Sequence, residues 1–257
     1  MRRLWRGLSP AATVYGLLLA WEGVCRAGLV TPFLLPAPSA IAWRLGQQLL
    51  AGDLAWHLAL SLYRTLVSFA LALLIAVPLG LAMGRVRGVR WFCEPLLAVG
   101  FPAPKIVFVQ VFMLWFGLHE LPKIAMATLE GIFPILSATY LGALGVDRSL
   151  LWSARNLGTG EVRLLWKVVL PAALPQVLNG AQIALPICFI VVFVTEMLLG
   201  GGGLGDAMML AQRFADSRGV FAGIVTVSLL GYGTMRVVAW TRRLLLHWHV
   251  ETQVRQL

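Results

Sequence analysis

The amino-acid sequence predicts an all-α protein that crosses a membrane about six times. Hydrophobic residues make up 59% of the chain and charged residues 12%, and the mean hydropathy is +0.82. An ordinary soluble domain has about 45–50% apolar and about 25% charged residues, so a soluble core cannot absorb this excess. Apolar windows of about 18 residues or more predict membrane-spanning helices, because about 20 helical residues cross the hydrocarbon layer. We interpret residues 1–257 as a single transmembrane domain.

The predicted spans follow one another along the chain, separated by short polar segments. Three arginines precede the first span, but no small-residue cleavage site follows it, so we interpret it as a retained helix. Prolines inside later spans are compatible with a helix bundle, where neighbouring helices and water satisfy the freed backbone groups. The six ranges are 11–29, 66–83, 96–117, 124–146, 173–199 and 220–240.

Two connections between spans have structure of their own. After the first span, Pro36 and Pro38 predict an extended entry, and Ser39 can cap a helix that lies along the membrane surface. A second amphipathic piece begins near Asp53 and leads into the next span. The run Gly200–Gly203 predicts a turn before a short helix, and no Lys-Ser or Lys-Thr follows it as a phosphate-binding loop requires.

The net charge of +10 reflects membrane topology rather than nucleic-acid binding. With the N-terminus in the cytoplasm, 14 of the 21 basic residues lie on the cytoplasmic side, and the C-terminus is cytoplasmic too. Six basic residues fall outside or at the outer interface, including Arg64 and Lys123, and Lys105 lies within a span. The three cysteines are scattered and lack metal-ligand spacing, so no metal site is expected.

The polar segment 147–171, between the fourth and fifth spans, is the most informative part of the chain. Asp147 or Ser149 can cap a first short helix, and Gly158 can end it in a left-handed conformation. Thr159 can cap a second helix, and Pro171 is expected to restart the chain as the next span. These residues are compatible either with a knob that docks on another protein, with Arg155 and Arg163 as its cations, or with a simple hairpin.

The spacing in this segment resembles a known motif. Gly158, nine residues, Val168, one residue and then Leu170-Pro171 is similar to the EAA loop in permease subunits of binding-protein-dependent ABC importers. Further segments, in chain order, resemble the nitrate/sulfonate/taurine branch of that family: Leu34–Pro38, Pro104–Ile106, Leu114–Gly117, Phe133–Ile135, Thr195–Leu198 and Gly203–Gly205. The loop departs from the family at its opening, where Trp152 stands for the usual glutamate and Ser153 for the following alanine.

The resemblance implies a function and a set of partners. It implies a permease in the bacterial inner membrane that pairs with a second permease subunit, expected to be a second copy. Two ATPase subunits would bind ATP and Mg²⁺ and dock on 147–171, and an external binding protein would deliver the solute. The chain itself would hold no cofactor and catalyse no reaction. The residues carried over to ATPase coupling are Ala154, Leu157, Gly158, Leu170 and Pro171, together with Arg155, and Arg163 joins them as a second cation of the loop.

Ionisable and polar groups inside spans are candidates for the translocation path, because they are costly in a bilayer. Lys105 and Glu130 fall at similar depth and can form a pair, or Lys105 can contact an anionic solute. Glu196 can bond the glycine turn or line a gate, and Gln110 can face the path. Together with the branch resemblance, Lys105 suggests a small anion such as a sulfonate, nitrate or carboxylate as the cargo.

Two other function classes remain as alternatives. A stand-alone secondary carrier or channel could use Lys105 and Glu130 for ion coupling, but it would not need a docking loop. A polytopic membrane enzyme should show clustered catalytic side chains at one membrane face. We find no nucleophile, base and acid that could act together, so no catalytic residue is predicted.

Overall fold

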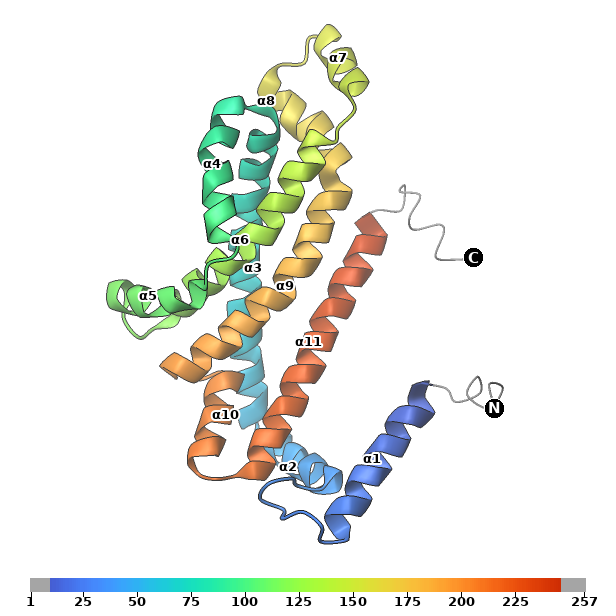
Figure 1. Ribbon diagram of the computed structural model, residues 1–257, viewed down its shortest axis with the longest axis vertical. Coiled ribbons are helices and arrows are strands. Elements are labelled where there is room, and N and C mark those ends of the chain that lie inside the picture. Colours follow the sequence, from blue (N-terminus) through green and yellow to red (C-terminus); the bar gives the residue numbers. More distant parts are fainter. Residues whose placement is uncertain (1–9, 246–257) are drawn as a thin grey trace.

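The computed structural model describes residues 10–245, and within that range all regular structure is helical (Figure 1). This confirms the predicted all-α fold. The elements in chain order are α1 (Pro10–Arg26), α2 (Pro38–Ala51), α3 (Asp53–Arg85), α4 (Arg87–Gly100), the 3₁₀ turn η2 (Lys105–Phe108), α5 (Val109–Phe116), α6 (Glu120–Leu144), α7 (Arg148–Asn156), α8 (Glu161–Leu164), the π-helical turn η3 (Leu165–Val169), α9 (Leu170–Leu199), α10 (Leu204–Arg213) and α11 (Ser217–Leu245).

Four helices of the described chain are long and apolar enough to cross a membrane. They are α3, α6, the continuous helix Glu161–Leu199 and α11, and the bent pair Arg87–Gly100 and Lys105–Phe116 makes a fifth when it is counted as one span. Helix α1 is described from Pro10, the first described residue, to Arg26, so its length does not test the predicted first span. The helix ends at Arg26, before the predicted end at 29.

The predicted third span, 96–117, is not one straight helix. Its two halves meet at an angle of 96°. The chain turns at Pro102 and Pro104 because proline lacks the N–H that a helix needs, and because the residue before a proline avoids the helical conformation. Helix α3 differs from the prediction in the opposite way, since the amphipathic piece at Asp53 continues into the span without a break.

The core of the bundle is formed by α3, α6 and α9, which cross closely because small residues line their contacts. A Cβ atom on Gly180 of α9 would lie 2.7 Å from the Cβ of Ala138 and 2.8 Å from the carbonyl oxygen of Pro134. A Cβ atom on Gly80 of α3 would lie 2.7 Å from the Cβ of Thr139 on α6. Such contacts let helix backbones approach closely, as is typical of membrane bundles.

The remaining helices attach to this core at its edges (Figure 1). Helix α1 lies away from the bundle, and its Glu22 accepts hydrogen bonds from the backbone N–H (3.0 Å) and side chain (2.7 Å) of Ser39. Ser39 therefore holds α1 rather than capping α2, whose N-cap Ala37 makes no side-chain bond. Arg44 of α2 pairs with Asp216 at the start of α11, with 2.6 Å between Nη2 and Oδ2.

Candidate functional site

The segment 147–171, which we call the coupling segment, lies at one end of the bundle, where α7 and α8 extend beyond the core helices (Figure 1). Helix α7 begins with an Asp147 cap, because Asp147 Oδ1 accepts a hydrogen bond of 2.9 Å from the Ser149 N–H. This hydrogen bond holds the pKa of Asp147 below its ordinary value. Of the two predicted caps, Asp147 is the one observed.

The corner after α7 is set by Gly158, whose φ of +76° confirms the predicted left-handed conformation. The Gly158 N–H donates to the Arg155 carbonyl (2.9 Å), and the Thr159 N–H donates to the Ala154 carbonyl (3.1 Å). These two bonds form a Schellman motif, the common way in which a helix ends at a glycine. Apart from its two chain neighbours, no atom of residues 10–245 lies within 4 Å of the position that a Gly158 Cβ would take, so the backbone conformation rather than space requires glycine here.

The second half of the coupling segment differs from the prediction. Helix α8 begins at Glu161, after Gly160 as N-cap, so Thr159 does not cap it. It then continues through η3 into α9 as one helix, Glu161–Leu199, so no new helix begins at Pro171. The π-helical turn ends at Val169, two residues before Pro171, so the N–H that proline lacks falls next to a part of the hydrogen-bond ladder that is already irregular.

An ion pair joins the two sides of the corner. Arg155 Nε donates to Glu161 Oε1 at 2.9 Å and Nη2 donates to Oε2 at 3.1 Å, a two-pronged contact. Both side chains are exposed. The pair therefore orients α7 relative to α8 more than it stabilises the fold, since exposed pairs contribute about 0.2–1 kcal/mol.

The coupling segment has an inner and an outer face. Ala154 and Leu170 pack on an apolar cluster that contains Leu151, Leu164 and Val169, and this fixes the segment to the ends of α3 and α6. Arg163 and Pro171 are exposed. The outer face carries large apolar side chains at high exposure: Trp152 (61%), Leu157 (85%), Val162 (72%) and Trp166 (49%).

Lys105 forms the predicted pair with Glu130, with 3.3 Å between Nζ and Oε2. The same ammonium donates to the carbonyls of Gly100 (2.9 Å), Phe101 (3.3 Å) and Ala103 (3.4 Å) and lies 4.6 Å from the centre of the Phe133 ring. Lys105 therefore satisfies backbone carbonyls that the break between α4 and α5 leaves open. Its three N–H donors are occupied, which does not favour direct contact with a solute.

Of the other predicted path residues, Gln110 is exposed on α5. Glu196 is fully buried and accepts hydrogen bonds from Ser61 Oγ, from Arg64 Nη1 (2.7 Å) and from the Gly205 N–H (3.0 Å). Of the two roles considered for Glu196, bonding the glycine turn is the one that the structure shows.

Glu196 belongs to a group that sequence reasoning missed, which we call the arginine cluster: Ser61, Arg64, Glu120, Lys123, Glu196 and the glycine turn Gly200–Gly203. Arg64 is fully buried, and all five of its N–H donors are used. Nη1 donates to Glu196 and to the Gly202 carbonyl (2.7 Å), Nη2 to Glu120 and to the Gly201 carbonyl (3.0 Å), and Nε to Glu120.

Arg64 and Lys123, which the charge count places outside or at the outer interface, have side chains that are buried between helices. Basic residues near the end of a span are normally interpreted as topology signals, so the role of Arg64 and Lys123 in a buried cluster was not predicted. A signal did exist in the sequence. Ser61, Arg64 and Ser68 recur at helical spacing in a mostly apolar stretch, and Glu196 interrupts a long apolar run.

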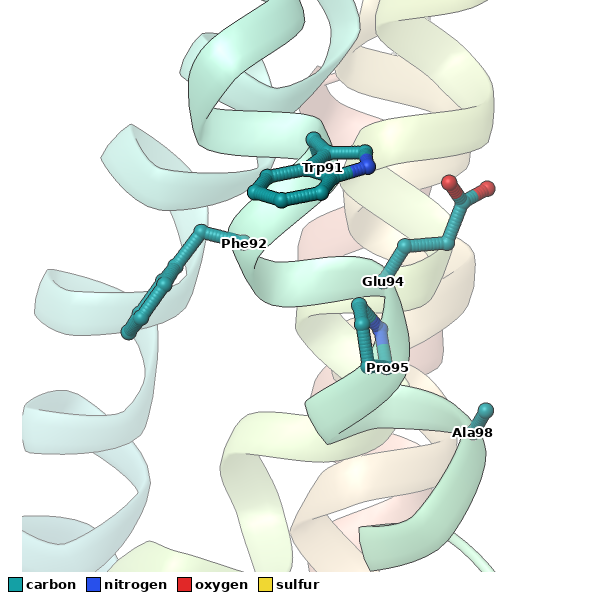
Figure 2. A pocket seen from close by; sticks show the side chains of 5 residues that line it. All are labelled: Trp91, Phe92, Glu94, Pro95 and Ala98. Atoms are coloured by element: carbon teal, nitrogen blue, oxygen red, sulfur yellow. The ribbon is translucent and has the colours of Figure 1, made fainter.

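A shallow hollow on the surface of α4 carries no comparable chemistry. Figure 2 shows its lining, which comes from α4 alone: Trp91, Phe92, Glu94, Pro95 and Ala98. One helix face cannot enclose a solute. In residues 10–245, no three His, Cys, Asp or Glu side chains lie together as a metal site requires.

The bundle of long apolar helices and the protruding helix pair define a helical membrane permease. Residues 76–246 match the family described as "Binding-protein-dependent transport system inner membrane component". The chain belongs to this family and is an inner-membrane transport subunit rather than an enzyme.

Relatives that are named as transport permeases match most of the chain. It is 32% identical over 232 residues to SsuC of Bacillus subtilis (strain 168), whose name refers to aliphatic sulfonates transport, covering 90% of this chain and 84% of SsuC. It is 30% identical over 246 residues to the taurine transport system permease protein TauC of Escherichia coli (strain K12), covering 94% and 90%. An inward-facing structure of the MetNI methionine ABC transporter shares the fold, with a TM-score of 0.67 and 18% identity over 76% of this chain and 97% of the other.

Proposed function

We propose that the chain is the permease subunit of an ATP-driven importer and that two ATPase subunits dock on the coupling segment. The observation that carries this proposal is the outer face of that segment, where Trp152, Leu157, Val162 and Trp166 are exposed on a corner held by Gly158 and the Arg155–Glu161 pair. Exposed apolar side chains grouped on a rigid protrusion are typical of a protein interaction site.

The proposed importer contains two copies of the permease, with the termini and the coupling segments in the cytoplasm. ATP and Mg²⁺ bind the ATPases, whose closure brings the paired coupling segments together. The bundles then rock between outward- and inward-facing states, as alternating access requires. An external binding protein delivers the solute from the other side.

The usual glutamate of the loop is Trp152 in this chain, and it is 61% exposed. We therefore propose that the partner ATPase offers an apolar pocket at this position rather than a basic one. Burying a large aromatic side chain contributes more than a solvent-exposed ion pair. The change alters partner choice while it preserves docking.

For the cargo we propose a small anion such as a sulfonate, nitrate or carboxylate. The support is that relatives covering most of the chain are named for sulfonate and taurine transport. Lys105 adds no support, because its donors are taken by Glu130 and by three carbonyls.

The test is capture of the ATPase by the full-length permease in detergent, followed by uptake into proteoliposomes with and without ATP. Leu157→Asp should abolish capture, because it places a charge in an apolar contact. Leu50→Asp is the matched control, since Leu50 is 91% exposed on α2 at the other end of the bundle. Equal capture by both variants would contradict docking, and uptake that continues without ATP would favour a secondary carrier.

A further inference from the structure

The two carboxylates that bind Arg64 in the arginine cluster are held very differently. Glu196 is 0% exposed and also accepts hydrogen bonds from Ser61 and from the Gly205 N–H. The Glu120 side chain is 44% exposed, and among residues 10–245 its hydrogen bonds come from Arg64 alone. Glu196 is therefore fixed, whereas Glu120 can leave the guanidinium and be rehydrated.

Lys123 gives a second, independent observation. It follows Glu120 by one helical turn on α6, and the whole residue is only 1% exposed. Its ammonium makes no hydrogen bond or ion pair with the described part of the chain. It lies beside the exposed turn residue Gly201, since a Cβ there would be 3.0 Å from Lys123 Nζ. A nearly buried ammonium without a hydrogen-bonding partner is costly, so a ligand that supplies one is favoured.

The remaining carboxylates near Lys123 are occupied by the glycine turn. Asp206 Oδ2 accepts the Gly202 N–H at 2.8 Å, and Glu196 accepts the Gly205 N–H at 3.0 Å. All four glycines of the turn have φ between +67° and +103°, and the turn is held by these hydrogen bonds. Neither acid can move to Lys123 without breaking the turn. Glu120 is the one acid of the cluster that is partly exposed and is held by Arg64 alone among the described residues.

We propose that Glu120 occupies an oxyanion site and that a small carboxylate, sulfonate or nitrate displaces it. The site consists of the Nε and Nη2 edge of Arg64 together with the ammonium of Lys123. This inference rests on the proposed function, for which it places one binding step of the anionic solute at the end of the bundle opposite the coupling segment.

The chemistry fits an anion that presents two oxygen atoms in one plane. Glu120 meets Arg64 with both oxygens, through Nε and through Nη2 at 2.8 Å, and carboxylate and sulfonate groups match this fork. Because an unpaired buried guanidinium is costly, the fork is not left empty. Glu120 and the anion therefore exchange, and Glu120 acts as an internal competitor.

The test measures binding of methanesulfonate and acetate to the full chain in lipid nanodiscs, with chloride at equal ionic strength as reference. If Glu120 fills the fork more than nine-tenths of the time, its removal raises the apparent affinity at least about tenfold. Glu120→Gln should therefore bind either probe at least about tenfold more tightly than the unaltered protein. Glu94→Gln, a control at an exposed carboxylate on α4, should change nothing.

Adding Lys123→Met to Glu120→Gln should abolish the gain, whereas a retained gain would exclude Lys123 from the site. Anion binding by Glu120→Gln that is no tighter than in the unaltered protein would overturn the proposal. If Glu120→Gln does not fold, Glu120→Asp gives the same decision, because its shorter side chain also loosens the pair. ATP-dependent uptake without tighter anion binding by Glu120→Gln would refute only this site. Tighter anion binding without ATP-driven uptake would refute only the proposed importer function.

Discussion

Replacing Gly158 by valine tests whether the shape of the corner transmits force. The residue has a φ of +76°, where a β-branched side chain is strongly disfavoured, at a cost of about 1–2 kcal/mol. No neighbouring atom would be touched, so this cost falls on the backbone alone. A penalty of this size lowers the ratio of the observed corner to other conformations about 5- to 30-fold.

Gly160 provides a matched control two residues away. A Cβ there also meets no atom within 4 Å, and its φ of −69° and ψ of 156° suit any residue. Gly160→Val adds the same side chain to the same segment without opposing its backbone. A difference between the two variants therefore reports conformation and not bulk.

The assay is ATP hydrolysis and solute uptake by the reconstituted complex, with membrane insertion measured in parallel. Gly158→Val should insert normally and lose uptake by up to about 5- to 30-fold, the factor by which the observed corner is disfavoured. Gly160→Val should transport at the level of the unaltered protein. Equal uptake by the two variants would refute the argument that the left-handed corner is needed.

Three further expectations concern the other buried and capping groups. Glu196→Ala removes the fixed partner of Arg64 and should destabilise the protein by about 3–5 kcal/mol, seen as a large fall in melting temperature in detergent; an unchanged melting temperature would argue against an essential pair. Lys105→Met should reduce the folded yield because it leaves Glu130 and the backbone carbonyls between α4 and α5 without a donor. Recovery of the yield in the double variant with Glu130→Gln would show that the charge pair matters more than the carbonyls. The pKa of folded Asp147 lies below the ordinary value of 3.8, so the stability that its cap gives to α7 should be complete above pH 3.8 and be lost as the pH falls through the folded pKa. Protection of the α7 amides from hydrogen exchange should therefore be equal at pH 7 and pH 5. A loss of protection between these two values would contradict the argument.

The positions of the core helices followed from hydrophobicity, because apolar length alone is enough to place a span. The break at Pro102 and Pro104 was visible as two prolines, but the 96° turn depends on how Lys105 and Phe133 pack after the chain bends. The continuation of α8 into α9 was missed because a proline such as Pro171 normally ends or begins a helix. The π-helical turn that accommodates it has no reliable sequence signature.

The first half of the coupling segment was predictable because its features are local. The Asp147 cap and the Gly158 corner depend on residues within a few positions in the sequence, and both were observed. The arginine cluster joins residues 56 and 132 positions from Arg64, and pairing over such distances cannot be deduced from spacing. Lys105 and Glu130 were paired correctly because both lie at a countable depth in adjacent spans.

The uninterrupted helix from Glu161 to Leu199 has a mechanical consequence. Its 39 residues form a shaft of about 58 Å at about 1.5 Å per residue, reaching from the corner of the coupling segment to the glycine turn. Because of this length, a tilt of about 5° about one end of the helix would displace the other end by about 5 Å. The π-helical turn near the corner is an irregular point in the shaft, in addition to the interior prolines Pro175 and Pro186, so deleting a residue from this turn should alter the displacement without touching either end.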